Sequence, residues 1–170
     1  LARELGPRRG SEEITRHLNV VYDAIIAELH RHGGSVIGFS GDAITCWFDD
    51  LDLQGNPRAD SSLERAAACA FAMQKGMTQF AAISTPNGKT IGLSIKVALA
   101  VGPARRMAIG NGNAHQMDVL AGATLSALAD AEHESERGEV VLAASNLTSV
   151  EERFNVAAWR AEKQFAVLTS

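Results

Sequence analysis

The chain has 170 residues and a mass of 18.0 kDa, with 46% hydrophobic and 21% charged residues. These values are typical of one globular domain long enough to bury its own core, and they exclude disordered and fibrous classes. Sixteen basic and twenty acidic residues give a net charge of -4, and only 5% of the residues are aromatic. Because a nucleic-acid surface needs a basic stripe or interleaved aromatic rings, the composition argues against nucleic-acid binding.

The two cysteines and the hydropathy indicate the cellular compartment in which the protein is found. Cys46 and Cys69 lie in apolar runs without His or Cys at metal-ligand spacing, which predicts two buried, reduced thiols and a cytoplasmic protein. No run approaches the roughly 18 to 20 apolar residues of a membrane span, and a signal-peptide pattern is absent from the first residues. Residues 1–6 have the pattern of a helix end that closes at Gly6. We therefore expect residues 1–170 to be one domain cut from a longer chain.

The first half of the chain predicts a helix, a hairpin and a second helix. Apolar residues at steps of three and four predict a helix from Ser11 to His32, which ends at the pair Gly33-Gly34. Two apolar runs, 35–39 and 43–48, flank Ser40-Gly41-Asp42 and predict a β-hairpin. After an acidic loop, a second helix is expected from Ser61 or Ser62 to Ala82, with small and apolar residues along one face.

The second half is richer in strands. Alternation predicts a strand from Leu93 to Val101, with 106–109 as its hairpin partner across Gly102-Pro103. A third helix is predicted at 123–132, and further strands are predicted at 116–120, 139–142, 154–159 and 164–168. The order helix, strand, strand, helix, strand is that of a ferredoxin-like unit without its first strand. We therefore expect an α+β fold, ferredoxin-like or palm-type, with a mixed β-sheet, helices on one face, and a first strand that would precede Leu1.

Asp42 is the candidate for chemistry, because it lies at the tip of a tight hairpin between two apolar strands. Two interpretations are open. A turn aspartate commonly caps nearby backbone N–H groups. Alternatively, a carboxylate held at the edge of a sheet can bind a divalent cation, especially when a second carboxylate from a neighbouring strand completes the site.

The segment GGSVIGFSGDAITCWF, residues 33–48, resembles the central hairpin of class III nucleotidyl cyclases, the adenylate and guanylate cyclases. The resemblance extends from Ser11 to Ala143 and includes the segments LSIKVALAVG, residues 93–102, and GEVVL, residues 138–142. Within this family, the sequence is most similar to the first catalytic domain of soluble, bicarbonate-responsive adenylate cyclases. The GG(D/E)EF hairpin of diguanylate cyclases is absent from the sequence.

The resemblance implies a site in which two aspartates hold two Mg²⁺ or Mn²⁺ ions against the phosphates of ATP. Asp42 matches the second aspartate and would be both a catalytic residue and a metal ligand. The first would lie on the opening strand, ahead of Leu1. Phe39 and Gly41 would flank the substrate. Asp118 lies near the position at which the family has the residue that recognises the adenine amino group. The alternative for Asp118 is a polar residue at a strand end.

The sequence departs from the family pattern at three places, so we expect a domain that is degenerate as well as truncated. Gly38 stands where the family has a lysine, and a glycine has no side chain that could reach a base or a bicarbonate ion. The helix at 123–132 lacks the asparagine and arginine of the transition-state pair. The single arginine of the bicarbonate-responsive domain would fall near Leu128. The pair Arg105-Arg106 is either a phosphate contact or a solvated strand edge.

Two functions fit this pattern. In the first, the chain is the metal-donating half of a class III adenylate cyclase that acts with a second cyclase domain, as a homo- or pseudo-heterodimer, in cyclic-nucleotide signalling. ATP is then favoured over GTP as substrate, and the isolated chain is inactive. In the second, the chain is a catalytically inactive regulatory or dimerisation module. A third interpretation, a ferredoxin-like RNA-binding domain, lacks the paired exposed aromatics that such a surface needs.

Overall fold

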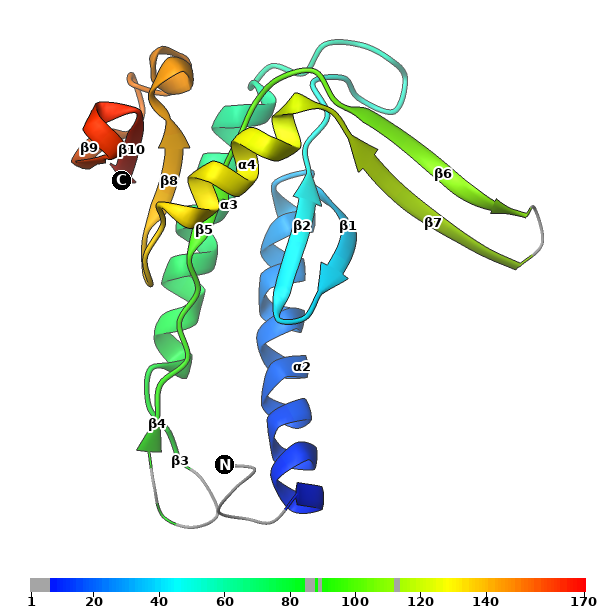
Figure 1. Ribbon diagram of the computed structural model, residues 1–170, viewed down its shortest axis with the longest axis vertical. Helices are drawn as coiled ribbons and strands as arrows, with labels where there is room; N and C mark the ends of the chain where they lie inside the picture. Colours follow the sequence, from blue (N-terminus) through cyan, green and yellow to red (C-terminus); the bar gives the residue numbers. More distant parts are fainter. Residues whose placement is uncertain (1–6, 85–87, 89, 112–113) are drawn as a thin grey trace.

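A computed structural model describes residues 7–84, 88, 90–111 and 114–170; the predicted helix end over residues 1–6 lies outside them. The described chain is a mixture of helices and short strands (Figure 1). In chain order the elements are α2 (Pro7–Arg31), β1 (Ser35–Ser40), β2 (Ala43–Trp47), α3 (Ser62–Met77), the 3₁₀ turn η1 (Thr78–Phe80), β3 (Ile83–Ser84), β4 (Thr90–Ile91), β5 (Val97–Leu99), β6 (Arg105–Asn111), β7 (Ala114–Ala121), α4 (Ala123–His133), β8 (Val140–Ala143), η2 (Ala144–Ser149), β9 (Asn155–Arg160), η3 (Ala161–Lys163) and β10 (Phe165–Thr169).

The strands confirm the α+β prediction. β5, β8, β10 and β9 form a four-stranded sheet in that order, in which β5 and β8 are parallel and the other pairs antiparallel. The remaining described strands pair two by two as antiparallel hairpins, β1 with β2, β3 with β4, and β6 with β7. The predicted hairpin of 35–39 with 43–48 is therefore confirmed, and it forms a sheet separate from the four-stranded one.

Helix α2 begins earlier than predicted and ends where predicted. It starts at Pro7 instead of Ser11, and proline suits a first helical position because it needs no partner for an N–H group. Beyond its end, Gly33 has a φ of +72°, which favours glycine. At Gly34 a Cβ atom would lie 2.7 Å from Phe48 Cζ and would also collide with Leu29. The glycine pair thus lets the chain turn tightly from α2 into β1.

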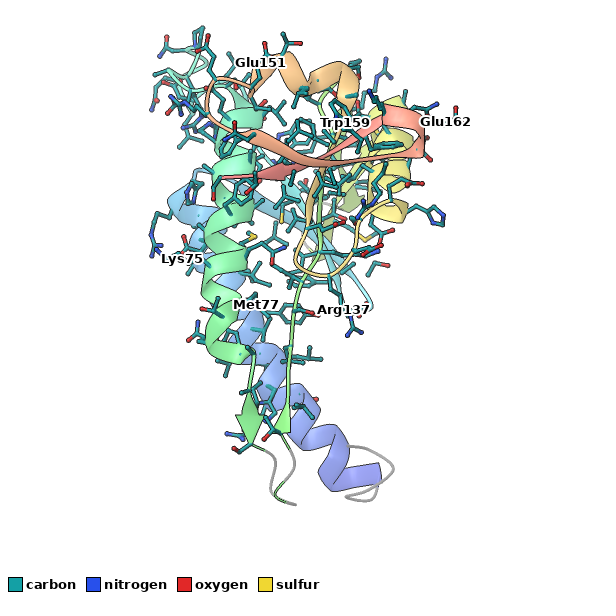
Figure 2. The ribbon with its side chains drawn as sticks, turned by 90° about the vertical axis from the view of Figure 1, so that its left-hand side faces the viewer. Lys75, Met77, Arg137, Glu151, Trp159 and Glu162 are labelled. Atoms are coloured by element: carbon teal, nitrogen blue, oxygen red, sulfur yellow. The ribbon has the colours of Figure 1, made fainter. Side chains whose placement is uncertain are left out.

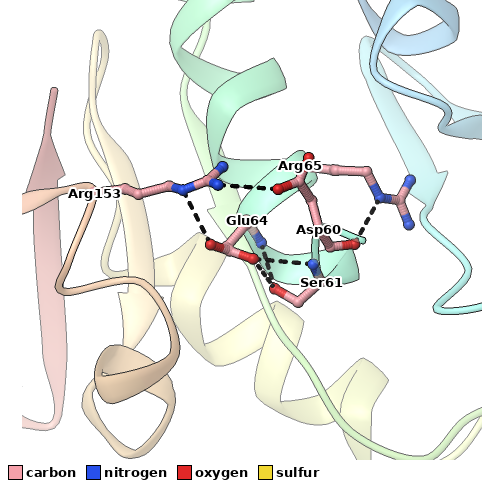
Figure 3. Close-up of polar contacts among 5 residues, drawn as sticks. All are labelled: Asp60, Ser61, Glu64, Arg65 and Arg153. Atoms are coloured by element: carbon pink, nitrogen blue, oxygen red, sulfur yellow. Dashed lines mark hydrogen bonds and ion pairs between the residues drawn. The ribbon is translucent and has the colours of Figure 1, made fainter. Parts of the chain in front are cut away.

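The start of α3 is fixed by a charged network (Figure 3). Glu64 N donates to Ser61 Oγ at 3.2 Å, and Ser61 N donates to Glu64 Oε2 at 3.0 Å, which is a capping box. Arg153 pairs with Asp60 at 3.0 Å and with Glu64 at 3.2 Å. Arg65 donates to the carbonyls of Asp60, His32 and Gly33. Because these contacts span three elements, they hold the end of α2 and the loop before α3 together.

Helices α2 and α3 pack on one side of the strands, as predicted. Two buried clusters form there. One joins α3 to β5, β8 and β10, and the other joins α2 and α3 to the β1–β2 hairpin. Helix α4 lies against the opposite face of the four-stranded sheet, where Ala131 packs with Val141 and Val167. This follows from the strand pleat, since Val140 and Leu142 face α3 while Val141, between them, faces α4.

Two predictions for the strands and one for α3 are wrong. The expected strand 93–101 is regular only in β5, because β8 pairs with just these three residues. The segment 106–109 does not pair with it. Instead Pro103 O accepts a hydrogen bond from Thr124 Oγ1 at 2.8 Å beside α4, and β6 pairs with β7. Helix α3 ends at Met77 instead of Ala82, because the chain tightens into η1.

The strands predicted at 116–120, 139–142, 154–159 and 164–168 are confirmed as β7, β8, β9 and β10, with ends that shift by one or two residues. The helix predicted at 123–132 is α4. The β6–β7 hairpin projects away from the rest of the molecule (Figure 1). No helix among the described residues has the length and apolar character needed to cross a membrane.

Candidate functional site

The β1–β2 turn presents Asp42 to solvent. Ser40 pairs with Ala43, so Gly41 and Asp42 form a two-residue turn, and Gly41 supplies the positive φ of +62° that such hairpins need. Asp42 is exposed, and its carboxylate makes no hydrogen bond or ion pair within the described part of the chain. The capping role that a turn aspartate usually has is therefore not observed here. This leaves the carboxylate available to a ligand.

Phe39 and Gly38 lie on β1, before the turn that carries Asp42. Phe39 packs edge-on against Tyr22 of α2, with ring centroids 5.4 Å apart, and still exposes 56% of its surface. Gly38, in the place of the family lysine, borders open space, since a Cβ there would meet nothing within 4 Å. The site therefore lacks the lysine although the fold has room for it.

Asp118 is held in an ion pair on the projecting β6–β7 hairpin. Arg106 Nη2 lies 2.7 Å from Asp118 Oδ2, and Arg106 Nη1 lies 3.5 Å from Ser35 Oγ on β1. The hydrogen bond from Arg106 holds the pKa of Asp118 below its usual range, and the same bond raises the pKa of Arg106. Asp118 lies inside β7, not at a strand end, and it lines neither of the two hollows that adjoin Asp42. Neither of these two hollows therefore brings Asp42 and Asp118 together.

A groove of about 800 Å³ separates the β1–β2 hairpin from β5. Its lining is largely apolar and comes mainly from α2, α3, β2 and β5, and it also includes Asp42 and Leu128 of α4. β2 and β5 are the edges of their sheets on the two sides of this groove. Figure 1 shows that the two strands run in the same direction. The backbone edges that face the groove could therefore both accept one antiparallel strand.

A second hollow, of about 670 Å³, also has Asp42 in its wall. It contains polar side chains that the sequence motifs did not single out, among them Ser94, Lys96, Ser135 and Arg137. The only signal for them was the alternation around the predicted strand, which placed Ser94 and Lys96 on its polar face. Nothing in the sequence placed the loop after α4 beside the hairpin.

The metal-binding capacity of the described residues is small. They contain no group of three or more His, Cys, Asp or Glu side chains able to hold an ion. Asp42 nevertheless fits one part of a magnesium or manganese site, because these cations often take one or two carboxylates from the protein and the rest from phosphates and water. Asp42 can contribute one ligand to such a site.

The two cysteines are free thiols between β2 and α3; Cys69 is buried, as predicted, whereas Cys46 is only partly buried. Burial raises the pKa of Cys46 to about 11 and that of Cys69 to about 12. Because the thiolate is the reactive form, we expect both to react with a disulfide reagent at pH 8 at least about 100-fold more slowly than a free thiol, whose pKa is about 8.5. Reaction with the reagent followed by absorbance, with and without urea, checks this. Fast reaction of the folded protein would contradict the packing of β2 on α3.

Comparison with solved structures places the fold of this chain among those of the cyclases. The chain superposes on the adenylyl cyclase CyaB from P. aeruginosa with a TM-score of 0.73 and 20% identity, covering 94% of this chain and 83% of that one. It superposes on the dimeric guanylyl cyclase domain of the RhoGC fusion protein from the aquatic fungus Blastocladiella emersonii with a TM-score of 0.71 and 21% identity, covering 92% and 81%.

A third structure, the guanylate cyclase domain of RhGC from Catenaria anguillulae in complex with GTP, gives a TM-score of 0.65 at 18% identity, covering 92% of this chain and 81% of that one. No protein-family model and no curated protein matches the sequence. The chain thus has the fold of class III nucleotidyl cyclase catalytic domains, in which both adenylyl and guanylyl cyclases are represented.

Proposed function

We propose that the chain is the metal-donating half of a class III adenylate cyclase that forms cyclic AMP and diphosphate from ATP together with a second cyclase domain in the cytoplasm. One observation carries the proposal. Within a cyclase fold, the carboxylate of Asp42 stands exposed at the hairpin tip, and no described donor engages it. ATP is favoured over GTP by the sequence resemblance.

The residues of the chain have limited roles in this reaction. Asp42 would hold Mg²⁺ or Mn²⁺, and Gly41 sets the turn that presents it. When bound, the metal would neutralise charge on the attacking and leaving oxygens. Phe39, which is half-exposed beside Tyr22, would flank the nucleotide on the side of the β1–β2 hairpin. The residues that read the purine and stabilise the transition state would come from the second domain, since Gly38 and α4 lack them.

The groove supports the proposal that a further strand completes this domain. A strand between β2 and β5 would run antiparallel to both, and it would arrive at the end of the molecule where α2 begins (Figure 1). In the proposed full protein this strand precedes the chain and carries the first metal-binding aspartate, so that it would reach the groove close to Asp42. Filling the groove would also join the two sheets into one.

The β6–β7 hairpin supports the proposal of a second domain. It exposes Met107, Ile109 and Met117, which are large apolar residues on a projecting element. Exposed apolar side chains gathered on one element are typical of a protein interface. Among the similar structures, the guanylyl cyclase domain from Blastocladiella emersonii is described as a non-canonical dimer in one crystal structure and as a monomer in another.

The 170-residue chain by itself is expected to form no cyclic AMP from ATP with either Mg²⁺ or Mn²⁺. Its described residues contain no group of three or more His, Cys, Asp or Glu side chains able to hold a metal ion, and Gly38 and α4 lack the residues that the partner would supply. Product formation by the purified chain and by its Asp42→Ala variant, measured by mass spectrometry, checks this. Cyclic AMP from the wild-type chain above the variant's background would contradict it. Activity that appears when the preceding strand and a second cyclase domain are joined to the chain would support the proposed function.

A catalytically inactive regulatory or dimerisation module is the second candidate. It is favoured by Gly38 at an open position and by the described residues, which contain no group of three or more His, Cys, Asp or Glu side chains able to hold a metal ion. The same joined protein separates the two candidates, because a regulatory module would associate with the second domain and yet form no cyclic nucleotide.

A further inference from the structure

The groove of about 800 Å³ between the β1–β2 hairpin and β5 is rich in sulfur. Both cysteines and two of the four methionines of the chain belong to its lining, and these are Cys46, Cys69, Met73 and Met77. The other two methionines are exposed on the β6–β7 hairpin. Cysteine and methionine sulfur is polarisable, and this distinguishes the lining from an aliphatic core. The groove therefore offers soft electron-pair donors to a ligand that enters it.

The secondary structure brings these side chains together from two elements. On β2, Cys46 packs against the buried cluster that joins the hairpin to α2 and α3. On α3, Cys69 and Met73 are four residues apart and therefore lie next to each other on one helix face. Figure 2 shows that Met77, four residues further on, lies on the side of α3 toward β5, whereas Lys75 lies on the other side. The sulfur residues of α3 thus share one face, which meets Cys46 in a single cluster.

The charges around Cys69 oppose a thiolate. Burial raises the pKa of Cys69 to about 12, and the negative charges of Cys46 and Glu28 contribute to this shift. Such a contribution requires that both groups lie near the Cys69 thiol. Glu28 is on α2, where Arg31 pairs with it and His32 Nδ1 lies 4.0 Å from its Oε2, so its charge is partly balanced. An anion at Cys69 is therefore disfavoured, whereas a cation that neutralises the sulfur is favoured.

We propose that Cys46, Cys69 and Met73 bind one Cu⁺ ion in the wall of the groove. Thiolate and thioether sulfur are ligands that select Cu⁺ over harder cations. On binding, a Cu–S bond forms at Cys69 as its S–H bond breaks and the proton leaves to water. The thiol of Cys46 and the thioether of Met73 each donate an electron pair. No electron is transferred, and one positive charge replaces another, so the complex is neutral, as burial in an apolar cluster requires.

Cu⁺ fits this site better than a divalent cation. A divalent ion would need two thiolates for neutrality, and both thiols resist ionisation because burial raises their pKa values. The described residues contain no group of three or more His, Cys, Asp or Glu side chains able to hold an ion, so a thioether must supply the third ligand. Neither Asp42 nor a second domain takes part, so the site stands whether or not the chain belongs to a cyclase pair.

Anaerobic titration of the 170-residue chain with Cu⁺, in competition with a coloured Cu⁺ chelator, tests the site. We expect one bound ion per chain. Cys46→Ala and Cys69→Ala should each weaken binding at least about 10-fold, which is a loss of about 1.4 kcal/mol. Met73→Leu, which nearly keeps the volume of the side chain, should weaken it by a smaller factor. Met117→Leu changes a methionine that is 64% exposed on β7, and this matched control should bind as the wild type does.

X-ray absorption at the copper edge gives a second measurement on the unaltered chain, and we expect sulfur as the only type of ligand. The proposal is overturned by nitrogen or oxygen ligands, by no binding in competition with the chelator, or by an affinity that survives the combined Cys46→Ala and Cys69→Ala change. Equal weakening in Met73→Leu and Met117→Leu would also overturn it, because Met73 would then not be a ligand. Circular dichroism shows whether each variant is folded. Where a cysteine variant is not, the absorption spectrum of the wild-type chain decides.

Discussion

Replacing Asp42 with Asn in the chain joined to its preceding strand and a second cyclase domain is expected to lower the rate of cyclic AMP formation by at least about 100-fold. The substitution keeps the size of the side chain and removes its charge. Loss of one anionic metal ligand is expected to raise the barrier by about 3 kcal/mol, since metals contribute several kcal/mol of charge stabilisation. The ratio kcat/KM, measured across a range of Mg²⁺ and Mn²⁺ concentrations, checks this.

Two further variants control the Asp42 experiment. Asp23→Asn changes an exposed aspartate of α2 and should leave the rate unchanged. Asp118→Ala should retain most of the activity, because the second domain reads the purine in the proposed function and Asp118 is already paired with Arg106. Full activity in Asp42→Asn would overturn the metal assignment and favour the regulatory module. Loss of activity only in Asp118→Ala would mean that the substrate-reading half was assigned to the wrong domain.

The local features of the fold were predictable because they depend on neighbouring residues. The capping box at Ser61 and Glu64 and the turn at Gly41 and Asp42 are decided within four positions of sequence. The apolar face of α2 was equally clear, since Val21, Ile25 and Leu29 follow helical spacing and are all buried. A helix or turn whose structure is determined by neighbouring residues can therefore be predicted without knowledge of the rest of the fold.

The pairing of strands was not predictable in the same way. Alternation from Leu93 to Val101 resembled one long strand, but a strand is as long as its neighbour's hydrogen bonds allow, and β8 pairs with three residues only. The partner of β6 was also predicted wrongly, as the strand at 93–101, because strand pairing depends on distant residues. Its pairing with β7 and the turn of the chain past Thr124 depend on α4, which lies later in the sequence.

Some residues of the candidate site could likewise be found from the sequence, and others only from the folded structure. Asp42 was found because the hairpin motif surrounds it, whereas Lys96 and Arg137 belong to segments that meet the hairpin only in the folded molecule. Asp118 was found by position in a family pattern. Its ion pair with Arg106 on the opposite strand could be recognised only once the register of β6 and β7 was known.

The position of Asp42 depends on the packing beneath its hairpin, and Leu29→Ala is expected to show this. Leu29 is completely buried in the cluster that joins α2 and α3 to the β1–β2 hairpin, so the substitution should lower the free energy of unfolding by about 2–5 kcal/mol. Leu53→Ala removes the same atoms from a side chain that is 97% exposed. This substitution should change the free energy of unfolding by less than about 0.5 kcal/mol. Urea unfolding followed by circular dichroism measures both. Equal stability of the two variants would mean that α2 does not support the hairpin, and the turn that presents Asp42 would then lack the rigid base that a metal ligand requires.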